Sequence, residues 1–462
     1  MREDLTMIDR NTVAAVATPA GVGGIATVRV SGKDAVEICD KAFKSAGGKK
    51  LGDLKGYQAL YGKIYDGEQP VDEAVCLVFK APHSFTGEDV VEITCHGGIF
   101  VVKKVLRVIL DCGAVPAGPG EFSKRAFLNG KMDLSGAEGI MTLINSQGEQ
   151  GMSAALNVLE GSLSKKVNEV NNSLVEICAH ISAWVDYPDE EIEELNEKEF
   201  LSTVSTAKKE IKALLDRFDS GMAVTGGVEA AIIGKPNAGK STLMNLLTGY
   251  DRSIVTDIEG TTRDVVEETV NVDGCILRLS DTAGIRETGD TVEKIGVEKS
   301  REKLARSAIV IAVFDSGDEL SKEDKELIAL CEGKPVIPVL NKTDKASKID
   351  RDYIISAMGE PVEMSAIDGG GLQELKDKIT ELLGTKSFDP NAAMLTNERQ
   401  RQCCLRAVES LTEAENALMM GVTLDAAGVC IDDAVSALLE LTGEKATQAV
   451  VDKVFSNFCV GK

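Results

Sequence analysis

The chain has 462 residues, of which 43% are hydrophobic and 27% charged; this is ordinary for a soluble globular protein of about three domains. The net charge of −23 excludes a broad basic surface, so any RNA contact is expected to be local or made mostly by a partner protein. No apolar run approaches the ~18 residues of a membrane-spanning helix, residues 1–15 show no signal peptide, and the scattered cysteines favour free thiols. We therefore expect a cytoplasmic protein.

Residues 1–118 are predicted to form an α+β domain. Four stretches are strand-like, at 13–17, 26–30, 74–79 and 90–94, and two are helical, at 34–43 and 100–112. The segment Gly21–Ala26 matches the dinucleotide pattern G-x-G-x-x-A, but the residues after it alternate like a strand, whereas that pattern must open a helix. A glycine-rich hairpin is therefore favoured. His96 could be catalytic, although a lone histidine more often makes a structural hydrogen bond.

Helical periodicity appears on both sides of residues 223–384. Upstream, apolar residues recur every three or four positions from 156 to 184, which predicts one long amphipathic helix. Downstream, three helices are predicted at 397–420, 424–441 and 448–458. Each half alone would expose its apolar stripe, so residues 119–222 and 385–462 are predicted to form one all-α domain. The loose segments 221–227 and 384–390 flank the inserted domain, and the acidic segment 186–199 is expected to be a solvated loop.

The inserted domain, residues 223–384, contains five short motifs in a characteristic order. They are GKPNAGKST (234–242), GTTRD (260–264), DTAG (281–284), NKTD (341–344) and SA (365–366). The first lies between an apolar strand at 228–233 and a helix at 241–247, the setting of a phosphate-binding loop. Apolar strands are also predicted at 276–279, before DTAG, and at 336–340, before NKTD. Its backbone amides and the helix N-terminus favour phosphate groups. The motifs predict an α/β P-loop domain of Ras-like type that binds and hydrolyses GTP.

The side chains of these motifs have separate predicted roles. Lys240 is expected to reach the β- and γ-phosphates, while Ser241 and Thr262 hold Mg²⁺. The Asp344 carboxylate accepts from the ring N–H and the amino group of guanine together. In chain order, the predicted nucleotide site comprises Asn237, Ala238, Gly239, Lys240, Ser241, Thr242, Thr256, Thr261, Thr262, Asp281, Thr282, Ala283, Gly284, Asn341, Lys342, Asp344, Ser365 and Ala366.

Two positions distinguish this GTPase from Ras-like proteins. Ile285 follows DTAG, where a glutamine would orient the attacking water. A charged residue farther along the chain is expected to replace it, and the candidates are Arg286, Glu287, Asp290 and Glu293. The second position is Asn237, whose side-chain carbonyl is expected to help bind a monovalent cation in place of an arginine finger.

Blocks along the whole chain resemble the MnmE (TrmE) family, the tRNA-modification GTPases of bacteria and organelles. They lie at 17–32, 84–98, 119–140, 254–264 and 281–296, and the ending FCVGK (458–462) carries the specific Cys-x-Gly-Lys motif. Gly139 and Val460 depart from the commoner alanine and isoleucine, but neither has an assigned role.

The resemblance implies a homodimeric, K⁺-stimulated GTPase that forms a heterotetramer with the FAD protein MnmG (GidA). Together they install an aminomethyl or carboxymethylaminomethyl group on carbon 5 of the tRNA wobble uridine. The N-terminal domain then resembles a folate-binding aminomethyltransferase, and it takes the one-carbon unit from a tetrahydrofolate derivative such as 5-formyltetrahydrofolate. The implied folate contacts are Arg29, Glu92, Lys131 and Lys462.

The resemblance also assigns roles within the GTPase domain. It implies that K⁺ binds Asn237, Thr256, Ile258 and Thr261, and that Glu293 orients the water. The predicted catalytic residues are thus Glu293, Lys240, Thr261 and Thr262. Cys459 falls near the folate region without a settled role.

Three alternatives remain open. A ribosome-assembly GTPase of the Era or EngA kind shares the phosphate-loop asparagine, but it would carry a basic RNA-binding domain. A folate-dependent one-carbon transferase regulated by GTP would work without MnmG. A regulatory switch would form no product beyond GDP.

Overall fold

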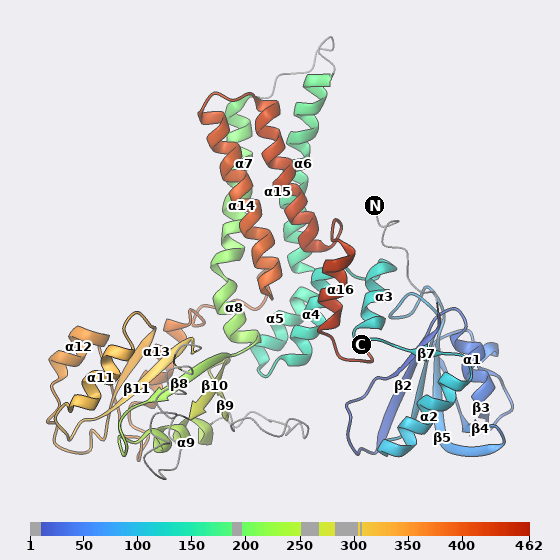
Figure 1. The fold of residues 1–462 in the computed structure, drawn as a ribbon, viewed down its shortest axis with the longest axis horizontal. Coiled ribbons are helices and arrows are strands. Elements are labelled where there is room, and N and C mark those ends of the chain that lie inside the picture. Colours follow the sequence, from blue (N-terminus) through green and yellow to red (C-terminus); the bar gives the residue numbers. More distant parts are fainter. Residues whose placement is uncertain (1–10, 187–195, 251–267, 282–303, 305–306) are drawn as a thin grey trace, which may run out of the picture. The chain divides into compact units, whose positions relative to one another are not determined.

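The computed structural model describes residues 11–186, 196–250, 268–281, 304 and 307–462 (Figure 1). Within these ranges the chain forms two compact units. The first contains the described parts of residues 1–141, 164–211 and 402–462, and the second contains those of 142–163 and 212–401. None of the helices in these ranges is both long and apolar enough to cross a membrane.

The first unit contains a seven-stranded sheet with the order β3-β4-β5-β6-β2-β1-β7. All neighbouring strands are antiparallel except β1 and β7. The four predicted strands are confirmed, and β1 and β2 form the antiparallel hairpin expected around the glycine-rich segment. The strands are β1 (Val13–Val16), β2 (Ile25–Ser31), β3 (Phe43–Ser45), β4 (Gln58–Asp66), β5 (Gln69–Phe79), β6 (Val90–His96) and β7 (Val115–Pro116).

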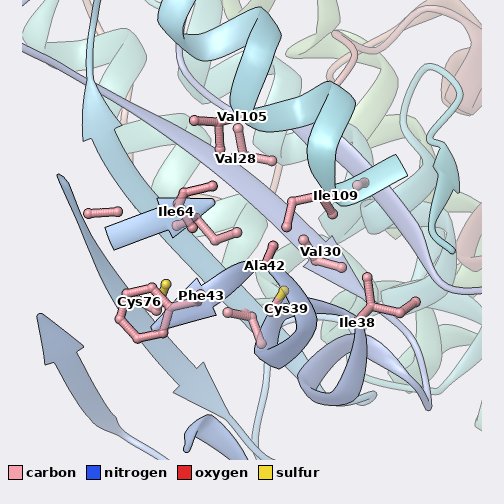
Figure 2. Close-up of a cluster of buried hydrophobic side chains, with 14 of the residues drawn as sticks. Val28, Val30, Ile38, Cys39, Ala42, Phe43, Ile64, Cys76, Val105 and Ile109 are labelled. Carbon is pink, nitrogen blue, oxygen red and sulfur yellow. The ribbon is translucent and has the colours of Figure 1, made fainter. Parts of the chain in front are cut away.

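Helices α1 (Ala35–Ala42) and α2 (Ile99–Asp111) confirm the two predicted helices and pack on one face of this sheet. Figure 2 shows Val28 and Val30 of β2 among side chains of α1, α2, β3, β4 and β5. Since side chains alternate along a strand, Arg29 lies on the opposite face. The sheet therefore has one buried apolar face and one face that carries polar side chains.

The remaining helices of the first unit confirm part of the predicted helical pattern. The three predicted C-terminal helices are α14 (Glu398–Met419), α15 (Leu424–Thr442) and α16 (Gln448–Ser456). The structure also contains α3 (Glu121–Leu128), α4 (Leu134–Asn145) and α7 (Glu197–Asp216).

The prediction of a single long helix from 156 to 184 is wrong. The chain forms α5 (Glu149–Leu159) and α6 (Ser162–Asp186), separated at Gly161, whose φ of +89° is incompatible with a continuing helix. The apolar spacing continues across this break, which explains the error.

The second unit contains a six-stranded sheet with the order β13-β12-β11-β8-β10-β9. Neighbouring strands are parallel except for the hairpin of β9 and β10. The strands are β8 (Val228–Ile233), β9 (Glu268–Val272), β10 (Cys275–Asp281), β11 (Ile309–Asp315), β12 (Val336–Asn341) and β13 (Val362–Glu363). The predicted strands at 228–233, 276–279 and 336–340 are confirmed. Central strand β8 leads directly into the predicted phosphate loop.

Helices cover both faces of this sheet, as two separate apolar clusters indicate. They include α9 (Lys240–Tyr250), α11 (Lys322–Leu330), α12 (Arg351–Met358) and α13 (Leu372–Leu382). The segment 221–227 was predicted as loose, but α8 (Phe218–Thr225) occupies most of it. The lack of a side chain at Gly221 admits Met394, whose Cε would lie 2.9 Å from a Cβ there. The glycine thus serves close packing rather than a loop.

Candidate functional site

The phosphate loop, residues 234–239, joins the carboxyl end of β8 to the N-terminus of α9. Two of its glycines are required by close approaches. A Cβ at Gly234 would lie 2.3 Å from the Val313 carbonyl oxygen, and one at Gly239 would lie 2.0 Å from Asn341 Nδ2. Both glycines also have positive φ angles, of +155° and +102°. The loop backbone is therefore pressed against the ends of the neighbouring strands β11 and β12.

Lys240, the first residue of α9, lies against this loop. Its Nζ donates to the main-chain oxygens of Gly234 at 2.8 Å and of Lys235 at 2.9 Å. The ammonium group is thus held at the loop backbone, the position predicted for contacts to phosphate groups. Ser241 and Thr242 follow in the first helical turn and are exposed. A hydroxyl at this position fits the donor set that Mg²⁺ prefers, which is oxygen.

The base-selecting motif is connected to the phosphate loop through Asn341. Its Nδ2 donates to the Ala238 carbonyl oxygen at 2.9 Å, and its Oδ1 accepts from the Ala366 amide at 3.0 Å. The side chain is buried, so these bonds satisfy a group that would otherwise be costly to bury. One asparagine therefore joins three of the predicted motifs.

Lys342 makes a second connection to the same loop. Its Nζ donates to the Asn237 carbonyl oxygen at 2.7 Å and to Asp315 Oδ2 at 2.6 Å. Burial acts to raise the pKa of the Asp315 carboxyl, but hydrogen bonds from Lys342 and the Gly317 amide outweigh it and hold that pKa below its usual value. Asp315 was not predicted, although a polar residue at the carboxyl end of an apolar strand is a usable signal.

Asn237 has a φ of +64°, a left-handed conformation that asparagine tolerates better than most residues. Its side chain is exposed, and its side-chain amide makes no hydrogen bond to another described residue. The binding of a cation by its side-chain oxygen stays a prediction.

The fold also places three other predicted site residues, Asp344, Ser365 and Asp281. Asp344 is exposed in the turn after Lys342, and Ser365 lies beside Ala366 after β13. Asp281 ends β10, at the same edge of the sheet as the phosphate loop. The residues that lie outside the described ranges are Thr256, Ile258, Thr261, Thr262, Thr282, Ala283, Gly284 and Glu293.

A second group of predicted residues lies on the polar face of the N-terminal sheet. Arg29 and Glu92 are register partners on β2 and β6, and the Arg29 Nε and Nη2 donate to Glu92 Oε1 at 2.9 and 2.8 Å. The guanidinium carbon lies 5.8 and 5.6 Å from the ring centroids of Phe85 and Phe122. Arg29 and Glu92 thus form an ion pair with each other.

The C-terminal tail completes this group. Arg29 Nη1 donates to the Gly461 carbonyl oxygen at 3.2 Å, and the Phe122 amide donates to that of Lys462 at 3.1 Å. Gly461 has a φ of +97°, and a Cβ there would lie 2.2 Å from the Val16 carbonyl oxygen. The final residues are therefore packed against β1 and the start of α3.

Of the residues predicted to bind an acidic ligand with an amino-pterin ring, Arg29 and Glu92 have hydrogen-bonding capacity left for it. Arg29 keeps N–H groups beyond the three bonds named, and Glu92 Oε2 accepts no hydrogen bond from the described residues. Lys131 donates instead to the Pro82 carbonyl oxygen at 3.0 Å, and no described contact joins it to Arg29. Cys459 is exposed, and its carbonyl oxygen accepts from the Gly120 amide.

His96 makes a structural hydrogen bond, as the simpler interpretation expected. Its Nδ1 lies 2.7 Å from Asp72 Oδ1, and its amide donates to Oδ2 of the same carboxylate at 2.8 Å. The hydrogen bond to Asp72 raises the pKa of His96 above its ordinary value. Across the described ranges, no group of three or more histidine, cysteine or acidic side chains is arranged to hold a metal ion.

Two family descriptions match the chain: "GTP-binding protein TrmE N-terminus" over residues 12–131 and "MnmE helical domain" over residues 134–459. The tRNA modification GTPase MnmE of Clostridioides difficile (strain 630) is 41% identical over 455 residues, which cover 98% of this chain and 99% of that protein. The chain belongs to the MnmE family. The resemblance inferred from the sequence is thereby confirmed.

Other similarities are of two kinds. The MnmE protein of Alkaliphilus metalliredigens (strain QYMF) is 42% identical over 459 residues and again matches 98% of this chain and 99% of its own length. A structure of an Aquifex aeolicus Era variant bound to GDP and aluminium fluoride is 28% identical over 40% of this chain and 66% of its own. Its TM-score of 0.29 is too low to support a comparison of site geometry.

Proposed function

We propose that this MnmE-family protein hydrolyses GTP and that hydrolysis serves the modification of tRNA. The observation that carries the proposal is the joining of the phosphate loop to the base-selecting motif. Asn341 contacts Ala238, and Lys342 contacts Asn237, so the phosphate-binding and base-binding segments form one site. Membership of a family of tRNA modification GTPases supports the same reading.

Each described residue of this site has a proposed task. Lys240 neutralises charge on the β- and γ-phosphates when it exchanges the loop carbonyls for phosphate oxygens. Asp344, exposed beside Lys342, accepts from guanine, and the loop amides orient the phosphates. Ser241 and Thr262 would hold Mg²⁺, which supplies positive charge to the transferring phosphoryl group. Asn237, Thr256, Ile258 and Thr261 are proposed to hold K⁺ and Glu293 to orient the water.

The N-terminal sheet is proposed to bind the tetrahydrofolate derivative. Arg29 and Lys462 suit its carboxylates, and Glu92 can accept from the pterin amino group. Lys131 is proposed as a folate contact only on the family resemblance, since its ammonium group donates to the Pro82 carbonyl oxygen.

The domain boundaries after residues 118, 222 and 384 also remain predictions.

The proposed reaction requires a second protein. In this proposal the chain acts as a cytoplasmic homodimer that joins MnmG and modifies carbon 5 of the wobble uridine. A net charge of −23 supports a division of labour in which MnmG presents most of the tRNA-binding surface.

The proposal is tested by GTP turnover of the purified protein together with nucleoside analysis of tRNA from cells that lack it. We expect hydrolysis of GTP but not ATP, and unmodified wobble uridines that return with the wild-type gene. Normal wobble uridines together with a defect in ribosome assembly would favour the Era-like alternative. One-carbon transfer to tRNA at full rate without MnmG or GTP would favour the transferase.

A further inference from the structure

The side chain of Lys235, the second residue of the phosphate loop, points to a task that the motif does not assign. Its Nζ lies 3.0 Å from Asp318 Oδ2 and 3.6 Å from Asp324 Oδ2, and the side chain is only 16% exposed. Asp318 follows β11, and Asp324 lies in the first turn of α11. The ammonium group is thus bound by two carboxylates rather than available to a phosphate.

Asp324 makes this contact costly to lose. Its side chain is 2% exposed, and its Oδ2 accepts from the Ser321 amide at 3.0 Å and from the Ser321 hydroxyl at 2.8 Å. Its Oδ1 has no hydrogen-bond partner in the described structure. A buried carboxylate needs an opposite charge, and the Lys235 ammonium is the cation placed beside it.

The charge of Lys235 is maintained by the same neighbours. Burial acts to lower the pKa of its ammonium group, but the hydrogen bond to Asp318 and the charge of Asp324 outweigh this and raise that pKa above its usual value. The Lys235 ammonium group therefore keeps its positive charge at neutral pH.

The backbone of the same residue organises the loop. The Lys235 carbonyl oxygen accepts from Lys240 Nζ at 2.9 Å and from the Ala238 amide at 3.3 Å. Together with the Gly234 carbonyl oxygen, it therefore holds the Lys240 ammonium group in place. Since Asn237 and Ala238 are fixed by Lys342 and Asn341, the side chain of Lys235 supplies the missing anchor at the start of the loop.

We propose that Lys235 is a positioning residue for GTP binding: its ion pairs with Asp318 and Asp324 hold the phosphate loop in the binding conformation. The inference rests on the proposed GTPase function. Without these ion pairs, the loop samples other conformations. Part of the binding free energy of the nucleotide is then used to order the loop. The apparent affinity then falls in proportion to the fraction of molecules whose loop is in the binding conformation, while bound GTP is hydrolysed as before.

The test measures the dissociation constants of GTP and GDP by calorimetry and kcat at saturating GTP. We expect Lys235→Gln to weaken both nucleotides by the same factor, about tenfold, with kcat changed by less than about twofold. Lys235→Arg should restore affinity to near that of the wild type. The control is Lys322→Met, which removes a 92% exposed lysine of α11 that pairs only with Glu326 among the described residues and should change nothing.

Unchanged affinity in Lys235→Gln would overturn the inference, as would a fall in kcat at unchanged affinity or a failure of Lys235→Arg to restore binding. If Lys235→Gln does not fold, the same titrations with Asp318→Asn test the inference. Asp318 is 58% exposed and can be changed without leaving a buried charge. It should weaken both nucleotides about twofold to threefold, and wild-type affinity would refute the anchor. A wild-type protein that binds no GTP would instead defeat the proposed function itself.

Discussion

Lys342 and Asn237 are joined by a hydrogen bond of 2.7 Å, from the lysine Nζ to the asparagine carbonyl oxygen. One belongs to the segment that selects the base, and the other is the loop residue proposed to bind a cation. The same ammonium group pairs with Asp315. The Lys342 side chain therefore connects the predicted base-selecting segment to the phosphate loop.

Lys342→Met should weaken GTP binding. It removes a charge-assisted hydrogen bond to the loop, and such bonds contribute about 1.5–3 kcal/mol, which corresponds to roughly 10- to 100-fold in affinity. Calorimetric titration measures this, with Lys348→Met as an exposed control nearby. Undiminished affinity in Lys342→Met would show that the loop holds its conformation without this contact.

Gly239→Ala should abolish measurable GTP binding, because the added Cβ would lie 2.0 Å from Asn341 Nδ2 and must displace that side chain. The matched control is Gly249→Ala in α9, where a Cβ would meet nothing within 4 Å. The control should bind GTP as the wild type does. Similar GTP binding in the two variants would refute the proposed role of the Gly239–Asn341 contact.

Asp344→Asn should change the base preference. The carboxylate accepts two hydrogen bonds from guanine, whereas an amide can also donate to the exocyclic oxygen of xanthine. Competition between GTP and xanthosine triphosphate measures the effect, and we expect preference to move toward xanthosine by at least about 100-fold. A variant that still prefers GTP as strongly as the wild type would remove Asp344 from the base site.

Arg29→Met should weaken binding of 5-formyltetrahydrofolate by about tenfold or more, because it removes a charge-assisted donor and leaves Glu92 without its partner. GTP turnover should stay unchanged. Arg107→Met removes an exposed arginine of α2 and serves as the control. Equal folate affinity in Arg29→Met and the wild type would show that the Arg29–Glu92 pair is only structural.

The sequence predicts the strands of the nucleotide site well, and the reason is physical. Strands β8 and β12 are central in a mostly parallel sheet and are covered on both faces, so they appear as continuous apolar runs. Their motifs then fix which residues follow each strand. Asn341, Lys240 and Gly239 consequently lie at the carboxyl ends of these two strands.

Other features could not be predicted because they depend on contacts between distant parts of the chain. The ion pairs of Lys235 with Asp318 and Asp324 show no periodicity or motif. The break at Gly161 is hidden because the apolar spacing continues across it. The packing of Gly461 beside Val16 joins the two ends of the chain, and no local pattern signals it.

The most direct test of the account compares GTP turnover in K⁺ and in Na⁺ at equal ionic strength, for the wild type and for Asn237→Ala. We expect the wild type to be faster in K⁺ by at least about tenfold, since a bound cation supplies charge that an arginine finger supplies elsewhere. Asn237→Ala should lose that difference. Equal rates of the wild type in the two salts, or no hydrolysis in either, would contradict the account.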